Sequence, residues 1–352
     1  MLDFAQADMM VRGGALSLLA LWSYILVRDH WAALAARMAL IMNLTIAAHV
    51  IVTIPGSVGA SAIDWLFEMA AASVPGLFWL FARSWFNDEA RIGWRSWALV
   101  GLSVANAAIA ISLQPLSSGL SYLCAGAMRL GMVAFAIAGL WHAWRGREND
   151  LVEARRRLRL WLVGSVGAYV ILTNVIEVLV HNGFGPPVWR SLLEVGVLFL
   201  TFAFCAAMFG TRQPDLFGAA MQPRTEDRPV LADDPLAARL LAFMDDQKPH
   251  RDETLTIAAL AGRLGEQEYR LRRLINGALG HRNFASFLNG YRLAEVKAAL
   301  ADPSQRDVPI LTIALDAGFG SLGPFNRAFR EAEGMTPSRY RQICGLADSG
   351  IG

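Results

Sequence analysis

The first 210 residues form seven long apolar runs that are separated by short polar segments. Most runs reach the roughly 20 residues with which an α-helix crosses a bilayer core of about 30 Å. The runs cover residues 9–27, 33–54, 63–82, 94–113, 120–144, 158–181 and 189–210. Arg12 interrupts the first run and is expected to reach out of the membrane toward polar surroundings. The pattern predicts a bundle of seven transmembrane helices. The alternative is that some runs are core helices of a soluble protein.

Arginine residues follow the first, third and fifth runs, whereas segments 55–62, 114–119 and 182–188 contain neither Lys nor Arg. Positive residues accumulate in the cytoplasmic loops of membrane proteins. Seven spans then place the N-terminus outside and everything after residue 210 in the cytoplasm of a bacterium. No cleavable signal peptide is evident, so we expect the first run to be retained in a multi-pass protein of the inner membrane.

The composition changes after residue 210. Hydrophobic residues make up 55% of the chain and charged residues 18%, but the excess of apolar residues stops at this point. Residues 211–235 mix prolines with polar residues and lack periodicity, which is typical of a flexible linker. The three cysteines, Cys124, Cys205 and Cys344, have no framework spacing and are expected to be free thiols.

The remaining chain has the pattern of a soluble helical domain over residues 236–345, with a short tail at 346–352. Residues 236–244 suit an amphipathic leading helix. Residues 255–278 predict a helix, a turn and a second helix, in which Thr254 or Thr256 caps the first helix and Gly265 makes the turn. The expected buried stripe of the second helix is Leu271, Leu274 and Ile275.

A second helix-turn-helix is predicted at residues 310–333, after a long helix at 283–300 that is expected to fix the spacing of the two motifs. In this second motif Gly318 makes the turn and Phe319 fills the core. We expect Ser321 to cap the last helix, which is buried through Phe325 and Phe329.

Three stretches of this region resemble the AraC/XylS family of transcription regulators. They are Ala314-Leu-Asp-Ala-Gly-Phe319, Phe325-Asn-Arg-Ala-Phe329 and Gly334-Met-Thr-Pro-Ser-Arg-Tyr-Arg341. The resemblance covers about residues 255–341, roughly a quarter of the chain. It implies two helix-turn-helix motifs that read successive major-groove segments of double-stranded promoter DNA. The expected fold is all-α: a seven-helix membrane bundle followed by an AraC-like double helix-turn-helix domain.

The resemblance also implies which residues contact DNA. The residues carried over from the first motif are Tyr269, Arg272 and Arg273, and those from the second are Leu322, Gly323, Pro324, Asn326 and Arg327. Arg270 and Arg330 are further candidates, and the alternative for each arginine is a solvated helix face. The stretch 322–324 offers no side-chain hydrogen bonds, so the second motif is expected to supply phosphate contacts and shape fit. Arg272 or Arg273 is expected to read guanine.

From residue 236 onward, 15 Lys or Arg oppose 13 Asp or Glu. With so small a surplus, DNA binding would depend on where the positive charges lie and not on how many there are. A single copy is then expected to bind weakly, which favours binding as a homodimer or larger multimer.

Polar residues within the apolar runs are costly and need a reason. The candidates that these runs offer for a binding pocket are His49, Asp64, Glu68, Arg129, Asn174, Glu177, His181 and Glu194. Most lie near the outer surface, which suggests an outward-open pocket for a small ligand or an ion. Two histidines with several carboxylates suit a divalent transition metal, although no spacing is diagnostic. The alternative is ion pairs and hydrogen bonds between helices.

Together these features predict a membrane-embedded, one-component regulator that passes a signal from the membrane to a cytoplasmic DNA reader. Two alternatives stay open: a transporter or enzyme with an accessory DNA-binding tail, and an anchor without a sensing role. No His-Glu-x-x-His, Gly-x-Ser-x-Gly or phosphate loop occurs, so neither an enzyme nor a cofactor is expected.

Overall fold

The computed structural model describes residues 4–54, 61–87, 92–113, 119–145, 147–181, 183–186, 188–210 and 235–348. The regular elements of these residues are helices, with one isolated antiparallel bridge, and the predicted all-α class is confirmed. The chain divides into two compact units. Unit 1 comprises Met1–Arg147 and Ala154–Met221, and unit 2 comprises Glu148–Glu153 and Gln222–Gly352. Residues 211–234, nearly all of the predicted linker, and 349–352 of the predicted tail lie outside the described residues.

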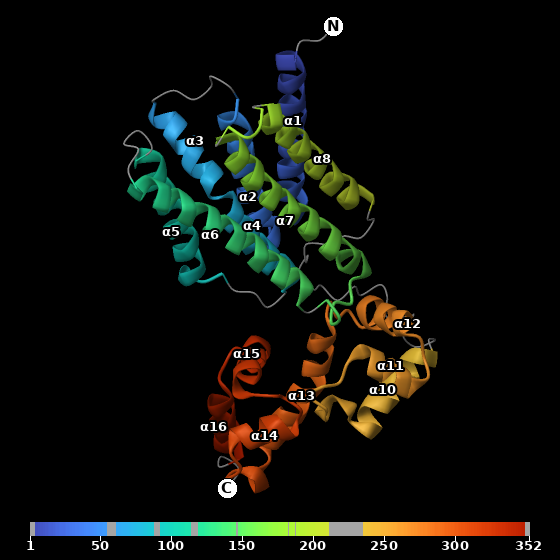
Figure 1. The fold of residues 1–352 in the computed structure, drawn as a ribbon. Helices are drawn as coiled ribbons and strands as arrows, with labels where there is room; N and C mark the ends of the chain where they lie inside the picture. The colour runs from blue at the N-terminus through green and yellow to red at the C-terminus, as the bar shows by residue number, and fades with distance from the viewer. Residues whose placement is uncertain are drawn as a thin grey trace. The chain divides into compact units, whose positions relative to one another are not determined.

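Unit 1 consists of helices that run alongside one another (Figure 1). They are α1 (Phe4–His30), α2 (Leu34–Val52), α3 (Ala62–Ala72), α4 (Val74–Phe86), α5 (Trp94–Leu113), α6 (Gly119–Trp144), α7 (Glu153–His181) and α8 (Val188–Gly210). The third apolar run is therefore not one straight helix. It breaks at Ser73, and α3 and α4 meet at an angle of 43°. Pro75 explains the break, because its ring lacks an N–H and clashes with the preceding turn.

Four helices of the described chain are long and apolar enough to cross a membrane, namely α1, α2, α5 and α6. The bent pair α3 and α4 would be a fifth span. In α7 and α8 the apolar segments are shorter, at Gly164–Val180 and Leu192–Ala206. Seven spans therefore stay a prediction.

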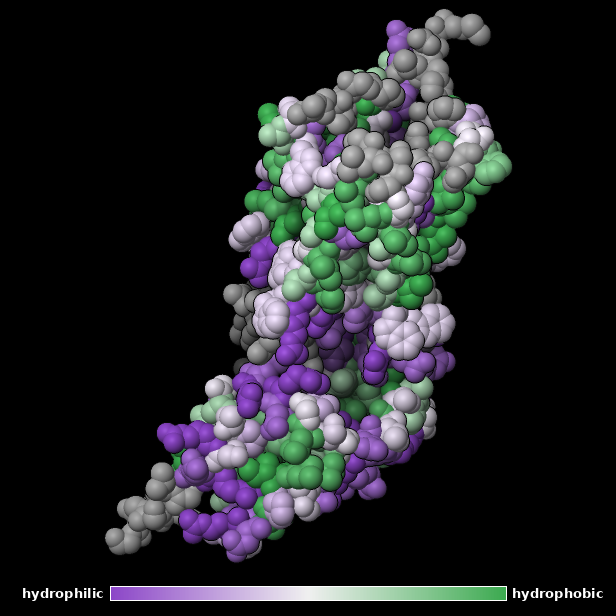
Figure 2. All heavy atoms as spheres, turned by 60° about the vertical axis from the view of Figure 1, so that its left-hand side comes forward, coloured by the Kyte–Doolittle hydropathy of each residue, from purple (hydrophilic) through white to green (hydrophobic). Residues whose placement is uncertain are grey.

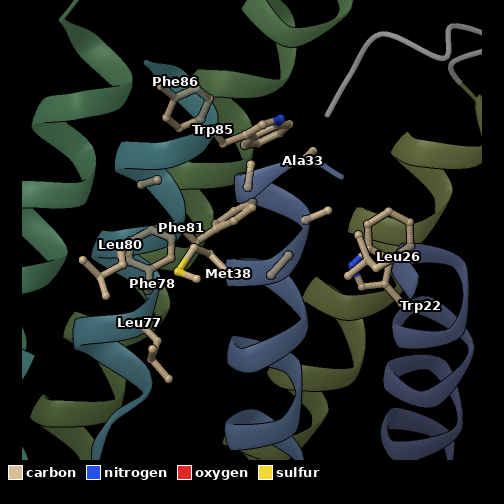
Figure 3. Packing of buried hydrophobic residues seen from close by; sticks show 14 of the residues in the cluster. Trp22, Leu26, Ala33, Met38, Leu77, Phe78, Leu80, Phe81, Trp85 and Phe86 are labelled. Atoms are coloured by element: carbon tan, nitrogen blue, oxygen red, sulfur yellow. The ribbon is translucent and has the colours of Figure 1, made fainter. Parts of the chain in front are cut away.

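The core of unit 1 is built around α4. Figure 3 shows Phe78, Phe81 and Trp85 of this helix pointing into the cluster that Met38 of α2 also enters. The rings of Phe81 and Trp85 stack at 5.3 Å. Gly139 of α6 permits a close approach, because a Cβ there would lie 2.7 Å from the ring of Phe78. Large and small side chains thus alternate across the helix contacts, as close packing requires.

Unit 2 contains a series of shorter helices (Figure 1). They are α10 (Pro235–Gln247), η3 (Pro249–Arg251), α11 (Ile257–Leu264), α12 (Glu268–Arg273), η4 (Leu274–Ala278), α13 (Phe284–Ala301), η5 (Pro303–Gln305), α14 (Ile310–Asp316), α15 (Leu322–Glu333) and α16 (Pro337–Asp348). Two apolar cores lie at the two ends of α13. Phe284, Phe287 and Leu288 enter the first core, while Val296 and Leu300 enter the second. The prediction that this helix bridges two motifs is confirmed.

The turns of the two motifs follow the predicted glycines. Thr256 caps α11 by accepting a hydrogen bond from the Ala259 N–H at 3.1 Å, and Gly265 ends that helix at φ +67°. Gly318 makes the second turn at φ +96°. Ser321 stands at the N-cap of α15, but its side chain makes no capping hydrogen bond, so that part of the prediction is wrong.

The helix predicted at 266–278 is shorter and changes its form. It is α-helical over Glu268–Arg273 and continues as the wider π-helical turn η4. The Leu279 N–H donates to the Leu274 carbonyl at 3.2 Å, which closes this wider turn. Such turns recur at functional sites of proteins.

Candidate nucleic-acid interface

Helix α12 presents a polar face to solvent and an apolar face to the first core. Leu271 and Ile275 are fully buried, whereas Tyr269 is 63% exposed. Arg270 and Arg273 are also exposed. Arg273 lies four positions after Tyr269, so their side chains share one side of the helix. This side therefore presents an aromatic ring and a guanidinium, groups that can contact the bases and phosphates of DNA.

Arg272 differs from the expectation that it faces bases, because it is only 5% exposed. Its Nε donates to the Glu268 carboxylate at 2.7 Å. Its Nη1 and Nη2 donate to the backbone carbonyls of Asp150 and Glu148, at 2.8 and 2.7 Å. A buried guanidinium requires such acceptors, since burying a charge without partners is costly. In this arrangement Arg272 has no free side for a base. The sequence did not predict this contact, because residues 148–150, which supply the two carbonyls, lie far from α12 along the chain.

The exposed face of α15 carries the residues predicted for the second motif. Leu322, Gly323, Pro324, Arg327 and Arg330 are exposed, and Asn326 is half-buried. The opposite face holds Phe325 and Phe329, which are fully buried and whose rings meet edge to face at 5.7 Å. The first turn of a helix has N–H groups without intrahelical partners, so Pro324 is tolerated there. This end of α15 suits backbone contact to phosphate more than base reading.

The distribution of ion pairs leaves positive charge on these two helices. Arg270 pairs with Glu266 at 3.1 Å, and Arg263 pairs with Asp252 at 3.1 Å. Among the described residues, no ion-pair partner faces the exposed side chains of Arg273, Arg327 and Arg330. Residues 236–352 carry 15 Lys or Arg against 13 Asp or Glu, yet α12 and α15 both carry arginines without an ion-pair partner among the described residues.

An ion network holds η3 against the middle of α13. Glu295 of α13 pairs with Arg251 and accepts a hydrogen bond from Lys248 Nζ at 3.4 Å. The Arg251 guanidinium lowers the pKa of the Glu295 carboxyl to about 2. The ring of His250 lies 3.1 Å from the same carboxylate, and burial lowers the pKa of this histidine. The network fixes the connection between the two motifs.

In unit 1, Arg12 belongs to a buried polar cluster, and the expectation that it reaches outward is wrong. Arg12 is 3% exposed, and its Nε donates to Asp8 at 2.8 Å. Its Nη1 donates to the Thr53 hydroxyl at 2.7 Å and lies 3.5 Å from the Glu194 carboxylate. The Thr53 hydroxyl in turn donates to Glu194 at 2.7 Å. A charged side chain within an apolar helix can either extend to the lipid headgroups or pair with an opposite charge inside the protein, and Arg12 does the second.

Glu194 is thus one pocket candidate that lies in a polar cluster, together with Asp8, Arg12 and Thr53, which the prediction did not include. Asp64 instead caps α3 in a capping box with Ser61. The Asn174 amide donates to the Val170 carbonyl within its own helix at 2.8 Å. The remaining candidates His49, Glu68 and Arg129 are half-buried.

Two pocket candidates, Glu177 and His181, lie on α7, but their side chains lie outside the described residues. Among the side chains that are described, no group of three or more His, Cys, Asp or Glu is arranged to hold a metal ion. The pocket stays a prediction.

The C-terminal part of the chain is similar in sequence to known proteins. A family described as "Helix-turn-helix domain" matches residues 260–343, which include α12 and α15. The transcriptional regulator Rob of Salmonella typhimurium is 31% identical over 102 residues, 29% of this chain and 34% of that protein. The right origin-binding protein of Escherichia coli is 31% identical over 93 residues, 26% of this chain and 31% of that protein. The chain thus spans about a third of the length of these two relatives.

The regulatory protein SoxS of Escherichia coli is 30% identical over 102 residues, which are 29% of this chain and 89% of SoxS. This match covers nearly the whole relative, and the family match spans α12 and α15. Through this domain, the chain belongs to the AraC family of transcription regulators.

Proposed function

We propose that the chain is a sequence-specific DNA-binding regulator of transcription that is embedded in the inner membrane of a bacterium. Unit 2 reads promoter DNA in the cytoplasm, and unit 1 holds it at the membrane and senses a signal there. The observation that carries the proposal is the pair of exposed, cationic helices α12 and α15, whose arginines Arg273, Arg327 and Arg330 lack ion-pair partners among the described residues.

On the DNA side, α12 is the main base reader. Tyr269 and Arg273 stand on one exposed side of this helix, and an arginine that donates twice to guanine contributes about 1–3 kcal/mol of discrimination. Arg327 and Arg330 of α15 supply phosphate contacts, which add affinity without sequence preference. Residues 236–352 carry a surplus of only two positive charges, 15 Lys or Arg against 13 Asp or Glu, so we expect two copies of the chain to bind together on a promoter.

On the membrane side, unit 1 has an apolar outer surface. In Figure 2 large apolar side chains, drawn in green, cover much of the visible surface of this unit. Leu102, Leu123 and Leu130 are 69–74% exposed, and Trp94 and Trp161 are 76% and 81% exposed. Apolar patches of this extent are rare on soluble monomers and are the normal surface of a protein in lipid.

The signal enters through unit 1. The buried cluster of Arg12, Thr53 and Glu194 joins α1 and α8 with the end of α2, so a ligand or ion that disturbs it would shift the helix that leads into the linker. The half-buried residues His49, Glu68 and Arg129 are the further candidates for such a pocket.

Arg273→Ala should weaken binding to the preferred DNA fragment by about tenfold, because it removes a base contact of about 1–3 kcal/mol. The full chain would be reconstituted in nanodiscs, a preferred fragment selected from fragmented genomic DNA, and the dissociation constant measured by fluorescence anisotropy. Arg270→Ala is the matched control on the same helix. Arg270 is already paired with Glu266, and its loss should change affinity by less than about threefold. A wild-type chain that prefers no fragment over random duplex overturns the DNA-reading proposal.

Reporter fusions test the membrane topology. A cytoplasmically active fluorescent protein fused after residue 210 should fluoresce, and an alkaline phosphatase placed in segment 114–118 should be active outside. Five spans and seven spans both leave the end of α8 inside, because both numbers are odd. An exported reporter after residue 210 contradicts the placement of unit 2 with the chromosome.

A further inference from the structure

A short segment between α6 and α7 belongs to unit 2 although the helices on both sides of it belong to unit 1. The segment is Glu148–Glu153. Asp150 forms an antiparallel bridge with Asn283, the residue that precedes α13. The Leu151 N–H donates to the Arg282 carbonyl at 3.0 Å, and the Phe284 N–H donates to the Asn149 carbonyl at 2.8 Å. The segment therefore pairs with the backbone of residues 282–284. These residues end the first helix-turn-helix region, by which we mean residues 255–284.

The docked segment is also buried. Leu151 is 3% exposed and packs in the first core of unit 2, and Asp150 and Val152 are each 1% exposed. Leu151 shares this core with Leu271 and Ile275, the buried stripe of the helix that carries the DNA-reading residues. The segment lies in a dry site built by the domain, because an adventitious surface contact would leave these side chains in water.

The segment accepts two hydrogen bonds from Arg272. The Nη1 and Nη2 atoms of this arginine donate to the carbonyls of Asp150 and Glu148 at 2.8 and 2.7 Å. An arginine that reads guanine donates from its guanidinium to two acceptors of the base. While Arg272 donates these hydrogen bonds to the two carbonyls, it cannot donate the same hydrogen atoms to a base.

We propose that the first helix-turn-helix region carries a docking surface for residues 148–152 of its own chain, and that this segment competes with DNA for Arg272. The proposal rests on the DNA-reading function proposed above. With the segment docked, α12 reads DNA with Tyr269 and Arg273 alone. Undocking adds Arg272 to the interface. Because the segment continues directly into α7 and follows α6 by a few residues, movement of either helix end pulls on the docking site.

A disulfide across the bridge tests the proposal. Asp150 and Asn283 form the bridge pair without mutual backbone hydrogen bonds, and such pairs place their Cα atoms about 4.5 Å apart, within the range for a disulfide. Asp150→Cys with Asn283→Cys would be made in a chain whose Cys124, Cys205 and Cys344 are replaced by serine. DNA affinity of the full chain in nanodiscs is then compared before and after reduction, and mass spectrometry verifies the bond.

We expect the oxidised chain to bind the preferred fragment at least about tenfold more weakly than the reduced chain, a difference of about 1.4 kcal/mol. Adding Arg272→Ala should abolish the difference. Leu151→Ser, which weakens docking, should raise affinity above wild type. Asn149→Ala is the matched control, because Asn149 is exposed and takes part through its carbonyl.

Three outcomes overturn the inference. The disulfide fails to form in the membrane-embedded chain, the oxidised chain binds as tightly as the reduced chain, or the redox difference persists with Arg272→Ala. A wild-type chain that binds no fragment in either state is a different result, since it removes the proposed function itself.

Discussion

Replacing Gly318 with alanine should cost unit 2 about 3 kcal/mol or more of stability. Two effects add. The residue has φ +96°, a region that side chains with a Cβ rarely adopt. A Cβ at this position would also lie 2.4 Å from the His250 carbonyl oxygen and 2.7 Å from the Arg251 Cα. Both contacts are to backbone, so no side-chain rotation relieves them.

The contact matters for DNA binding because it sets the distance between the two motifs. Arg292 of α13 donates to the carbonyls of His250 and Asp252 at 2.7 and 3.0 Å, and its guanidinium lies over the Phe319 ring at 5.8 Å. The turn at Gly318 therefore packs on η3, and η3 is fixed to α13. Pushing the turn away displaces α15 from its register with α12, so we expect Gly318→Ala to lose specific DNA binding as well as stability.

Hydrogen exchange by mass spectrometry, on peptides from α13 to α15 in the full chain, measures this effect locally. Gly265→Ala is the matched control. Gly265 has φ +67°, but nothing lies within 4 Å of the place that a Cβ would occupy, so that variant reports backbone strain alone and should cost about 1 kcal/mol. Equal losses in the two variants would show that the close approach of the Gly318 turn to η3 contributes nothing.

Much of unit 2 could be predicted because its signals are local. The apolar periodicity predicts the buried faces of α11, α13 and α15, and the glycines at 265 and 318 mark the turns. Neither the packing of Gly318 on His250 nor the capture of Arg272 could be predicted. The first contact joins residues 68 positions apart, and the second joins α12 to carbonyls more than 120 residues earlier.

Unit 1 shows the same division between local and distant signals. Hydropathy predicts the helices, but the continuous apolar run over 63–82 masks the effect of Pro75, which breaks it into α3 and α4. Arg12 is visible in the sequence as an interruption of the first run. Its partner Asp8, one turn earlier, is a local sign of pairing, whereas Glu194 lies far along the chain and has no such sign.

Arg12→Ala should be among the most damaging substitutions in unit 1. The change leaves Asp8 and Glu194 buried without their shared counter-ion, and removing one partner of a buried pair typically costs about 3–5 kcal/mol. The cluster also joins α1 to α8 and to the end of α2, so its loss loosens the first and last helices of the unit together.

All 11 tryptophans lie before residue 190, so tryptophan fluorescence reports the packing of unit 1 without a contribution from unit 2. The thermal midpoint of the solubilised chain, followed by this signal, should fall clearly for Arg12→Ala. Arg28→Ala is the matched control on the same helix. Arg28 pairs with Asp29 at 2.7 Å but is 59% exposed, and exposed pairs of this kind contribute little to stability, so the midpoint should stay near that of the wild type.

Combining Arg12→Ala with Glu194→Gln separates the loss of charge balance from the loss of packing. The glutamine keeps an oxygen for the Thr53 hydroxyl, which donates to Glu194 at 2.7 Å, and it leaves one fewer buried charge without a partner. The double variant should therefore recover part of the midpoint that the single variant loses. A double variant that is less stable than Arg12→Ala would mean that Glu194 stabilises the helices without Arg12, and the cluster would then not act as an ion pair.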